Sequence, residues 1–287
     1  MKPATFQYHA PATVKEAVDL LGALPNARLL AGGQSLVPML NLRAATPDHI
    51  IDLGGVAGLN SIRESPTTLR IGAMTTQRAI ERSDLIRSNC PLLTETVLHV
   101  GHQQTRNRGT LGGSLCHLDP GAELPVIAAA LEAVLTVEGP SGSRTLCFDE
   151  FPAGYLTTTL EPDEVLTEIE IPKAGADEGY AFLEFNQRPA DFAVVCVAVS
   201  LAFEGARVRR ARIAIGGVDY APIRLTEAEN SLRGETAGAE AFARAAAVAA
   251  ALRCEGDEVS PADFRQHLAG VLTGRALSRA AERAGRT

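Results

Sequence analysis

The sequence predicts an α+β fold in which a two-part N-terminal region precedes an antiparallel sheet and three helices. Three observations support this prediction. Some stretches repeat apolar residues at helical spacing, whereas others alternate as half-buried strands do. Two segments, 31–36 and 109–114, combine paired glycines with a hydroxyl residue beside an apolar run. At 287 residues and 46% apolar composition, the chain is long enough for two domains with buried cores.

The first part, about residues 1–56, is predicted to form a small βαβ unit. Its strands are expected at 6–8, 28–31 and 50–53. Thr13 and Glu16 form a capping box that opens a helix. The apolar face of that helix consists of Val14, Ala17, Val18, Leu21 and Leu24. The glycine-rich segment after residue 31 therefore lies at a strand end, where ligands are commonly held.

The second part, about residues 57–176, is predicted to be a larger α+β region. Its strands are expected at 59–63, 69–71, 134–138, 144–148 and 165–171, and its helices at 76–82, 91–100 and 124–133. Gly139 and Gly142 favour a hairpin between two of these strands. The strand at 165–171 alternates apolar with polar residues and is closed by Pro172.

A short polar segment with two glycines, residues 173–179, marks a domain boundary. We therefore divide the chain into residues 1–176 and 177–287. The second domain is predicted to hold a three-stranded antiparallel sheet at 180–186, 192–203 and 208–215. A three-helix bundle follows, with helices beginning near Thr226, near Glu240 and after Ser260-Pro261.

Composition excludes several classes of function. A net charge of −7 without an extended basic run disfavours nucleic acid or an anionic membrane as the partner. No signal peptide or membrane span is recognisable, so we expect a cytoplasmic protein. The five cysteines are widely spaced and lack the patterns of an iron–sulfur cluster or zinc site. If this chain transfers electrons, it needs an organic cofactor.

The two glycine-rich segments predict an anion-binding site. Glycine allows a ligand to approach the backbone amides, and the hydroxyls of Ser35, Thr110 and Ser114 add donors. Neither segment has the P-loop lysine pattern or reads G-x-G-x-x-G, which disfavours a nucleotide kinase and a Rossmann dehydrogenase. The remaining interpretation is a dinucleotide whose diphosphate is held by two loops. Ordinary tight turns are the alternative.

Three spaced motifs carry a resemblance to a known family. They read AGGQSLVPML at 31–40, RNRGTLGGS at 106–114 and DPGAELP at 119–125. With them, the chain resembles the FAD-binding medium subunit of molybdenum hydroxylases, the group that includes carbon monoxide dehydrogenase and xanthine dehydrogenase. Residues 185–193 and the closing helix at 263–277 also fit, so the resemblance covers nearly the whole chain. It implies a two-part FAD-binding domain followed by the sheet and helices.

The resemblance also implies which residues bind FAD. The two glycine-rich segments are expected to hold its diphosphate and ribityl chain through Ala31, Gly32, Gly33, Gln34, Ser35, Leu36, Thr110, Gly112, Gly113 and Ser114. His117, between the second and third motifs, is expected to contact the cofactor as well. No metal ligand and no catalytic acid, base or nucleophile is expected in this chain, because the flavin does the electron chemistry.

Three further residues are candidates for the flavin site. Asp119 and Glu123 lie four apart at the entry to an apolar helix, so both carboxylates could share one face or one could lie at the helix N-terminus. Helix capping is an equally good reading of Asp119. An acidic residue at the position of Glu123 lies against the flavin in the xanthine dehydrogenase branch. Leu166 matches a position that contacts the isoalloxazine ring there, although a strand leucine is usually core.

A histidine pair and a departure from the xanthine dehydrogenase branch also bear on the site. His99 and His102 lie three apart, but no third ligand completes a metal site, so we read them as surface or helix-end residues. The xanthine dehydrogenase branch carries a lysine near the strand that precedes residue 186, where this sequence has Leu183 and Glu184. This departure leaves the role of Glu184, the electron acceptor and the oxygen reactivity open.

The function that the resemblance implies is electron transfer. Substrate would be hydroxylated at a molybdenum cofactor on a large subunit, and electrons would pass through two [2Fe-2S] clusters on a small subunit. FAD on this chain would receive them and pass them to an external acceptor, in a dimer of heterotrimers. The substrate is not predictable, because the large subunit would select it.

Two other classes of function stay open at this stage. A stand-alone flavin-dependent oxidoreductase would turn over substrate as the isolated chain. A non-catalytic nucleotide-binding module would hold FAD or ADP without accepting electrons from partner subunits. The sequence offers no strong candidate for the base near the flavin that the first alternative needs.

Overall fold

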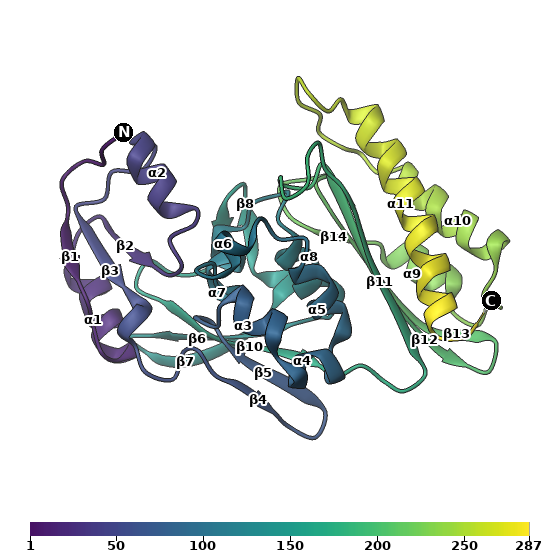
Figure 1. The fold of residues 1–287 in the computed structure, drawn as a ribbon, viewed down its shortest axis with the longest axis horizontal. Helices are drawn as coiled ribbons and strands as arrows, with labels where there is room; N and C mark the ends of the chain where they lie inside the picture. The colour runs from purple at the N-terminus through teal and green to yellow at the C-terminus, as the bar shows by residue number, and fades with distance from the viewer. Residues whose placement is uncertain (287) are drawn as a thin grey trace.

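The computed structural model describes residues 1–286 and shows three regions in a row along its longest axis (Figure 1). A small parallel sheet lies at one end, and a five-stranded sheet with helices lies in the middle. A four-stranded sheet backed by three helices forms the other end. The chain runs through the three regions in sequence order. Their mixture of helices and sheets agrees with the predicted α+β class.

The N-terminal sheet forms the predicted βαβ unit. Its three strands are parallel in the order β1-β3-β2, with bounds β1 (Gln7–His9), β2 (Ala27–Leu30) and β3 (His49–Asp52). The helices are α1 (Val14–Ala23), α2 (Leu36–Leu42) and the 3-10 helix η1 (Leu53–Gly55). The Glu16 amide donates to Thr13 Oγ1 (3.2 Å), as predicted. The Glu16 carboxylate, however, accepts from the Ala12 amide, one residue before the predicted partner.

The middle sheet has the strand order β4-β5-β10-β6-β7. Its strands are β4 (Ile62–Glu64), β5 (Thr68–Gly72), β6 (Val134–Gly139), β7 (Gly142–Cys147) and β10 (Val165–Pro172). The predicted hairpin is formed by β6 and β7. These strands pair antiparallel, from Val134 with Cys147 to Gly139 with Gly142 at the turn. Beyond it lie η2 (Phe148–Glu150) and the small β8 (Pro152–Gly154) and β9 (Thr157–Thr158) ladder.

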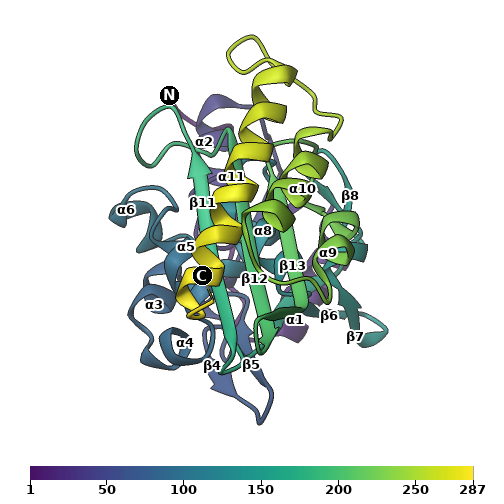
Figure 2. The same cartoon turned by 90° about the vertical axis from the view of Figure 1, so that its right-hand side faces the viewer.

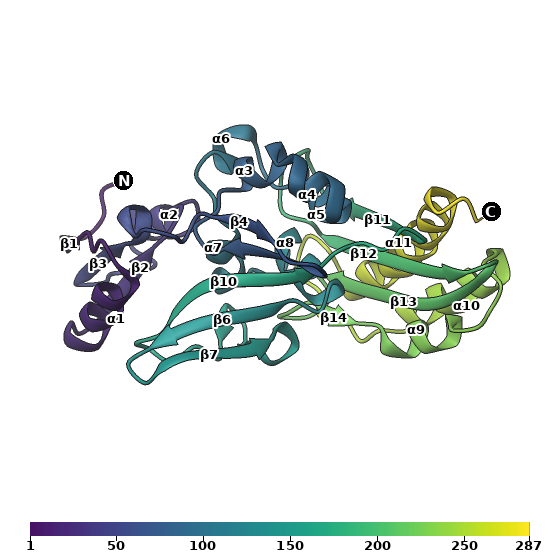
Figure 3. The ribbon, with the colours of Figure 1, turned by 90° about the horizontal axis from the view of Figure 1, so that it is seen from below.

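Six helices accompany this sheet, and Figure 3 shows α3, α4 and α6 on the side of the molecule opposite the β6–β7 hairpin. They are α3 (Gln77–Arg82), α4 (Asp84–Asn89), α5 (Pro91–Val97), α6 (Gln103–Arg106), α7 (Leu111–His117) and α8 (Glu123–Ala130). Helix α8 is buried along its entire length, as its apolar composition predicted.

The second glycine-rich segment is not the loop that the sequence predicted. Gly112, Gly113 and Ser114 belong to helix α7, which Thr110 caps by accepting a hydrogen bond from the Gly113 amide (3.0 Å). Leu111 and Leu115 are four apart on this helix and both are buried, so packing outweighs the low helix propensity of paired glycines.

The C-terminal sheet has four strands instead of the predicted three. The order is β11-β12-β13-β14, with bounds β11 (Glu178–Phe185), β12 (Val195–Glu204), β13 (Arg207–Gly216) and β14 (Ile223–Arg224). The added strand, β14, is only two residues long, too short to show a pattern in the sequence. Three helices follow as predicted: α9 (Thr226–Leu232), α10 (Ala239–Ala250) and α11 (Ala262–Arg283).

Both faces of the C-terminal sheet are covered. Figure 2 shows α9, α10 and α11 in front of β11, β12 and β13. The opposite face packs against α5 and α8 of the middle region. Phe182, Cys196, Ala198 and Ala214 of the sheet therefore belong to the same apolar cluster as the middle helices. Within the part of the chain that the structure describes, no helix has the length and apolar character needed to cross a bilayer.

Candidate functional site

A cleft lies where strand β2 ends, at the first glycine-rich segment. Its volume is about 380 Å³, and it is lined by Leu30, Ala31, Gly32, Gly33, Gln34, Val37, Pro38 and Arg108. Gly33 has a positive φ of 74°, a conformation that favours glycine. The chain turns there and enters α2, whose first residue is Leu36. Ser35 precedes α2 and its side chain makes no capping bond to that helix.

The two glycine-rich segments lie against each other. A Cβ on Gly32 would come within 2.1 Å of the Arg108 carbonyl oxygen, and a Cβ on Gly113 would approach Ala31 Cβ to 3.3 Å. Real Cβ atoms do not come within 3.0 Å of other heavy atoms, so only glycine fits at Gly32. The structure therefore brings together the two segments that sequence analysis assigned to one ligand.

The polar groups of the second segment are partly used by the fold itself. Thr110 is buried and caps α7, so its hydroxyl oxygen already has a partner. Gly112 packs against Ala73, where an added Cβ would lie 2.5 Å from Ala73 Cβ and 2.8 Å from its carbonyl oxygen. Ser114, half-buried in the first turn of α7, is the remaining hydroxyl of this segment.

Arg108 is a cleft residue that sequence analysis missed. Its neighbour Arg106 is tied into the structure, because it donates to Glu81 (3.1 Å) and to the carbonyl oxygens of Val100 and Gly101. Arg108 is exposed and contributes a positive charge to the cleft lining. Its place immediately before the glycines of the second motif was the signal that could have identified it.

The chain leaves α7 through the residues that were predicted to approach the flavin. His117 is the last residue of α7 and is half-buried. Asp119 lies in the loop, where its Oδ1 accepts from the Gly121 amide (2.9 Å). Asp119 therefore does not share a helix face with Glu123, which is the first residue of α8. It stabilises the turn that leads into α8.

Glu123 is buried, with only 3% of its surface exposed, and lies near a second buried carboxyl group. Burial raises the pKa of Glu123 to about 7, and the charge of Glu184 on β11 adds to this increase. Glu184 Oε1 lies 3.0 Å from His99 Nδ1 and accepts from Asn186 Nδ2 (2.9 Å). The hydrogen bond to Glu184 raises the pKa of His99.

The remaining candidates are Leu166 and the histidines His99 and His102. Leu166 on β10 is 4% exposed and belongs to the apolar core of the middle region, so its contact with the flavin stays a prediction. His102 precedes α6 and is exposed, whereas His99 pairs with Glu184, so the two histidines do not act as a pair. The predicted reading of both as helix-end residues agrees with these positions.

Comparisons with known proteins identify the family. The family model of the FAD binding domain in molybdopterin dehydrogenase matches residues 4–174, and that of the CO dehydrogenase flavoprotein C-terminal domain matches residues 180–280. The chain belongs to the FAD-binding medium subunits of molybdenum hydroxylases. The resemblance that the three motifs suggested is therefore confirmed.

Members of this family match the chain from end to end. The carbon monoxide dehydrogenase medium chain of Hydrogenophaga pseudoflava is 40% identical, with 98% of each chain covered. The nicotine 6-hydroxylase medium subunit of Paenarthrobacter nicotinovorans is 35% identical over 99% of this chain and 100% of its own length. Among solved structures, carbon monoxide dehydrogenase from Hydrogenophaga pseudoflava superimposes with a TM-score of 0.96 at 40% identity, covering 99% of both chains. Quinoline 2-oxidoreductase from Pseudomonas putida 86 reaches 0.95 at 37% identity, covering 99% of each.

The cleft residues fit the cofactor of this family. FAD carries a diphosphate, which backbone amides beside glycines and a positive side chain recognise. Gly32 and Gly33 line the cleft, and Arg108 supplies the positive charge. The cleft volume lies within the range of typical cofactor sites.

Proposed function

We propose that this chain carries FAD as the electron-transfer subunit of a molybdenum hydroxylase. In this proposal, FAD accepts electrons from [2Fe-2S] clusters of a small partner subunit and passes them to an external acceptor. Substrate is hydroxylated at the molybdenum cofactor of a large subunit. The observation that carries the proposal is the contact between the two glycine-rich segments beside the cleft, in a chain that matches medium subunits over its full length.

The proposed FAD site combines both segments and the entry to α8. Residues Ala31, Gly32, Gly33, Gln34, Ser35 and Leu36 hold the diphosphate and ribityl chain together with Thr110, Gly112, Gly113 and Ser114. His117, Asp119, Glu123 and Leu166 belong to the flavin end of the same site. Arg108 joins the diphosphate end, because it lines the cleft beside Gly32. When bound, FAD supplies the redox chemistry, and the chain orients it and sets the charge around it.

We also propose the division of the chain and its assembly. Residues 1–176 form the FAD-binding domain, made of a part up to about residue 56 and a part after it, and residues 177–287 form the second domain. The change from the middle sheet to the C-terminal sheet between β10 and β11 supports this boundary. A dimer of heterotrimers in the cytoplasm is the assembly we propose, and the free state of all five cysteines supports a reducing compartment.

Purification of the tagged chain with its partners tests the proposal. We expect a flavin absorption spectrum overlaid with iron–sulfur absorbance, and one large and one small subunit in the same complex. Mixing with substrate should bleach the iron–sulfur and flavin bands together. A colourless chain that binds neither FAD nor partners would contradict the proposal. Substrate turnover by the isolated, flavin-loaded chain would favour a stand-alone oxidoreductase.

A further inference from the structure

A group of titratable side chains meets where three elements of the middle and C-terminal regions join. Glu123 begins α8, Glu184 lies near the end of β11, and His99 follows α5. Helix α5 packs against both α8 and β11. The side chains of Glu123, Glu184 and His99 therefore come from three segments that are distant in sequence. We call these three residues the acid–imidazole cluster.

One carboxylate oxygen of this cluster has no partner. Glu184 Oε1 is satisfied by His99 and Asn186, but Glu184 Oε2 is buried and makes no hydrogen bond to any group in residues 1–286. Only 6% of the Glu184 side chain is exposed. A buried acceptor without a hydrogen bond costs free energy of folding. Proteins commonly retain such a group where it has a second role, for example in redox chemistry.

The charges around the cluster do not neutralise it. Glu95 of α5 faces His99, but it is already paired with Arg283. Asp119 and Cys196 are the other titratable groups that interact with Glu123 or with its neighbours. Between residues 1 and 286, no lysine or arginine forms an ion pair with Glu123 or Glu184. With His99 protonated and both carboxyls ionised, the cluster carries a net charge of −1, and one proton makes it neutral.

We propose that the acid–imidazole cluster binds one proton when the neighbouring flavin is reduced. The inference rests on the proposed function, which puts the flavin beside Glu123. The charge of Glu184 already raises the pKa of Glu123, and added negative charge nearby increases the affinity of Glu123 for a proton further. His99, with 37% of its side chain exposed, connects the cluster to solvent.

When bound, FAD would supply the two-electron chemistry and would take up one proton of its own on reduction. The cluster takes a second proton from solvent, held on a carboxyl group, and no bond within the cluster is broken. In the complex the electrons come from the [2Fe-2S] clusters, and in the test they come from an electrode. The sum is two electrons and two protons for each flavin.

Potentiometric titration of the FAD-loaded chain at several pH values tests this proposal. Because Glu123 is already largely protonated below its pKa of about 7, it takes up a proton on reduction only above that pH. In that range two protons are taken up, and the equilibrium constant for flavin reduction falls a hundredfold for each pH unit, equivalent to about 60 mV. With the Glu123→Gln variant it falls tenfold, equivalent to about 30 mV. A redox-induced infrared difference spectrum of the wild type should show a protonated carboxyl band on reduction, and this band should be absent from Glu123→Gln.

Two further variants keep the test decisive. Glu184→Gln removes the repelling charge without touching a predicted FAD ligand, so the steep region of the titration should end at a lower pH. Glu229→Gln is the matched control, because Glu229 is similarly buried but pairs with Arg224 in the C-terminal region. It should titrate like the wild type. Equal slopes in the wild type and both cluster variants would overturn the proposal while leaving FAD binding intact. A wild-type chain that binds no FAD would overturn the proposed function as well.

Discussion

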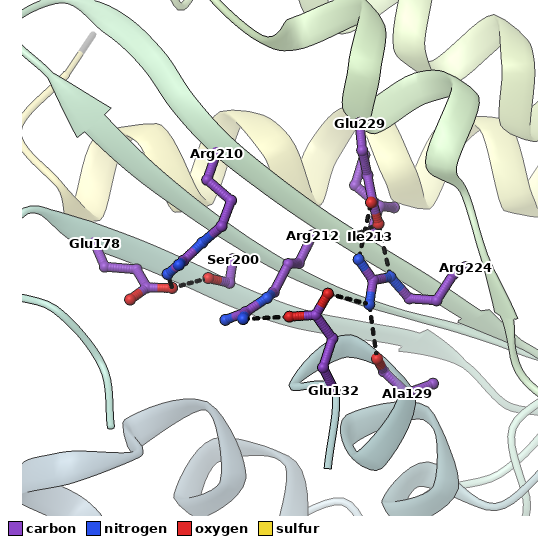
Figure 4. Close-up of polar contacts among 9 residues, drawn as sticks. All are labelled: Ala129, Glu132, Glu178, Ser200, Arg210, Arg212, Ile213, Arg224 and Glu229. Carbon is purple, nitrogen blue, oxygen red and sulfur yellow. Dashed lines mark hydrogen bonds and ion pairs between the residues drawn. The ribbon is translucent and has the colours of Figure 1, made fainter. Parts of the chain in front are cut away.

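The two ends of helix α8 carry charged groups that are arranged in opposite ways. At its C-terminal end, Arg224 donates to the Ala129 carbonyl oxygen (3.1 Å) and to both oxygens of Glu229 (2.7 and 2.8 Å). Arg212 of β13 donates to Glu132 just beyond the helix (Figure 4). At its N-terminal end, the charge of another carboxyl group, Glu184, helps to raise the pKa of Glu123, and one oxygen of Glu184 has no partner among the described residues.

The difference separates a contact that holds the fold together from one that we propose to serve the flavin site. Cations at a helix C-terminus are favourable, and the arginines there join α8 to the C-terminal sheet. A carboxylate at a helix N-terminus is also favourable, yet burial outweighs that effect at Glu123 and raises its pKa. The N-terminal end therefore costs stability and lies on the side of the proposed flavin.

Breaking the ion pair between Arg224 and Glu229 at the C-terminal end of α8 should have the largest effect on stability. In Arg224→Met, Glu229 would keep a nearly buried charge without its bidentate partner, so we expect a loss of about 3–5 kcal/mol in the free energy of unfolding. Urea unfolding followed by circular dichroism measures it. Arg244→Met, which removes the exposed pairs to Glu235 and Glu240, is the control and should cost less than about 1 kcal/mol. Similar losses in both variants would contradict this role of Arg224.

Neutralising the N-terminal end should change the pH dependence of stability. The pKa of Glu123 is about 7 in the folded chain and has its ordinary value of 4.5 in the unfolded chain. The folded chain therefore binds this proton more tightly, and the stability that the proton contributes is lost as pH rises from 4.5 through 7. The raised pKa of His99 acts in the same direction. As pH rises from about 4 to about 8, the free energy of unfolding of Glu123→Gln should increase by about 3 kcal/mol relative to that of the wild type. Parallel stability curves for the two proteins, measured without FAD, would show that Glu123 is ionised in the fold.

The contact between the two glycine-rich segments offers a smaller and more local change. Gly32→Ala pushes a Cβ into the Arg108 carbonyl oxygen, which we expect to cost about 2 kcal/mol in stability and to weaken FAD binding more than tenfold. Gly22→Ala is the control, because a Cβ there meets nothing within 4 Å and lies in helix α1. That control should be slightly stabilising and bind FAD normally. Fluorescence titration with FAD compares the two.

Arg108→Ala should have the smallest effect, and on binding alone. We expect the dissociation constant for FAD to rise about fivefold, equivalent to about 1 kcal/mol, with a smaller difference at high salt. Riboflavin, which lacks the diphosphate, should bind both proteins equally. Arg209→Ala removes an exposed arginine of β13 and should leave FAD affinity unchanged. A loss of riboflavin affinity in Arg108→Ala would indicate a role other than diphosphate recognition.

Sequence patterns predicted most of the fold because its elements are locally encoded. The apolar face after Thr13, the hairpin at Gly139 and Gly142, and the alternating strand before Pro172 all correspond to observed elements. Helices α2, α4 and α6 and strands β8, β9 and β14 were missed. Ser83 caps α4 by accepting from the Ile86 amide (3.2 Å), a local signal that was available. For β14, two residues are too few to show a period.

The site was predictable only where it lies on continuous motifs. The segments at 31–36 and 110–114 were singled out from their motifs, and their binding of FAD stays a prediction. The helix in the second segment depends on the close packing of Gly112 against Ala73, which no spacing reveals. The meeting of Glu123, Glu184 and His99 arises from tertiary packing of distant segments. The sequence identified each of these three residues separately, and neither the pairing of His99 with Glu184 nor the buried position of Glu123 could be inferred from it.

A crystal structure of the FAD-loaded complex tests the central claim most directly. The account predicts that the diphosphate lies between the Gly32–Ser35 segment and the start of α7, with Arg108 alongside, and that the isoalloxazine ring lies next to Glu123. FAD bound elsewhere, or a ring distant from the N-terminal end of α8, would contradict the account.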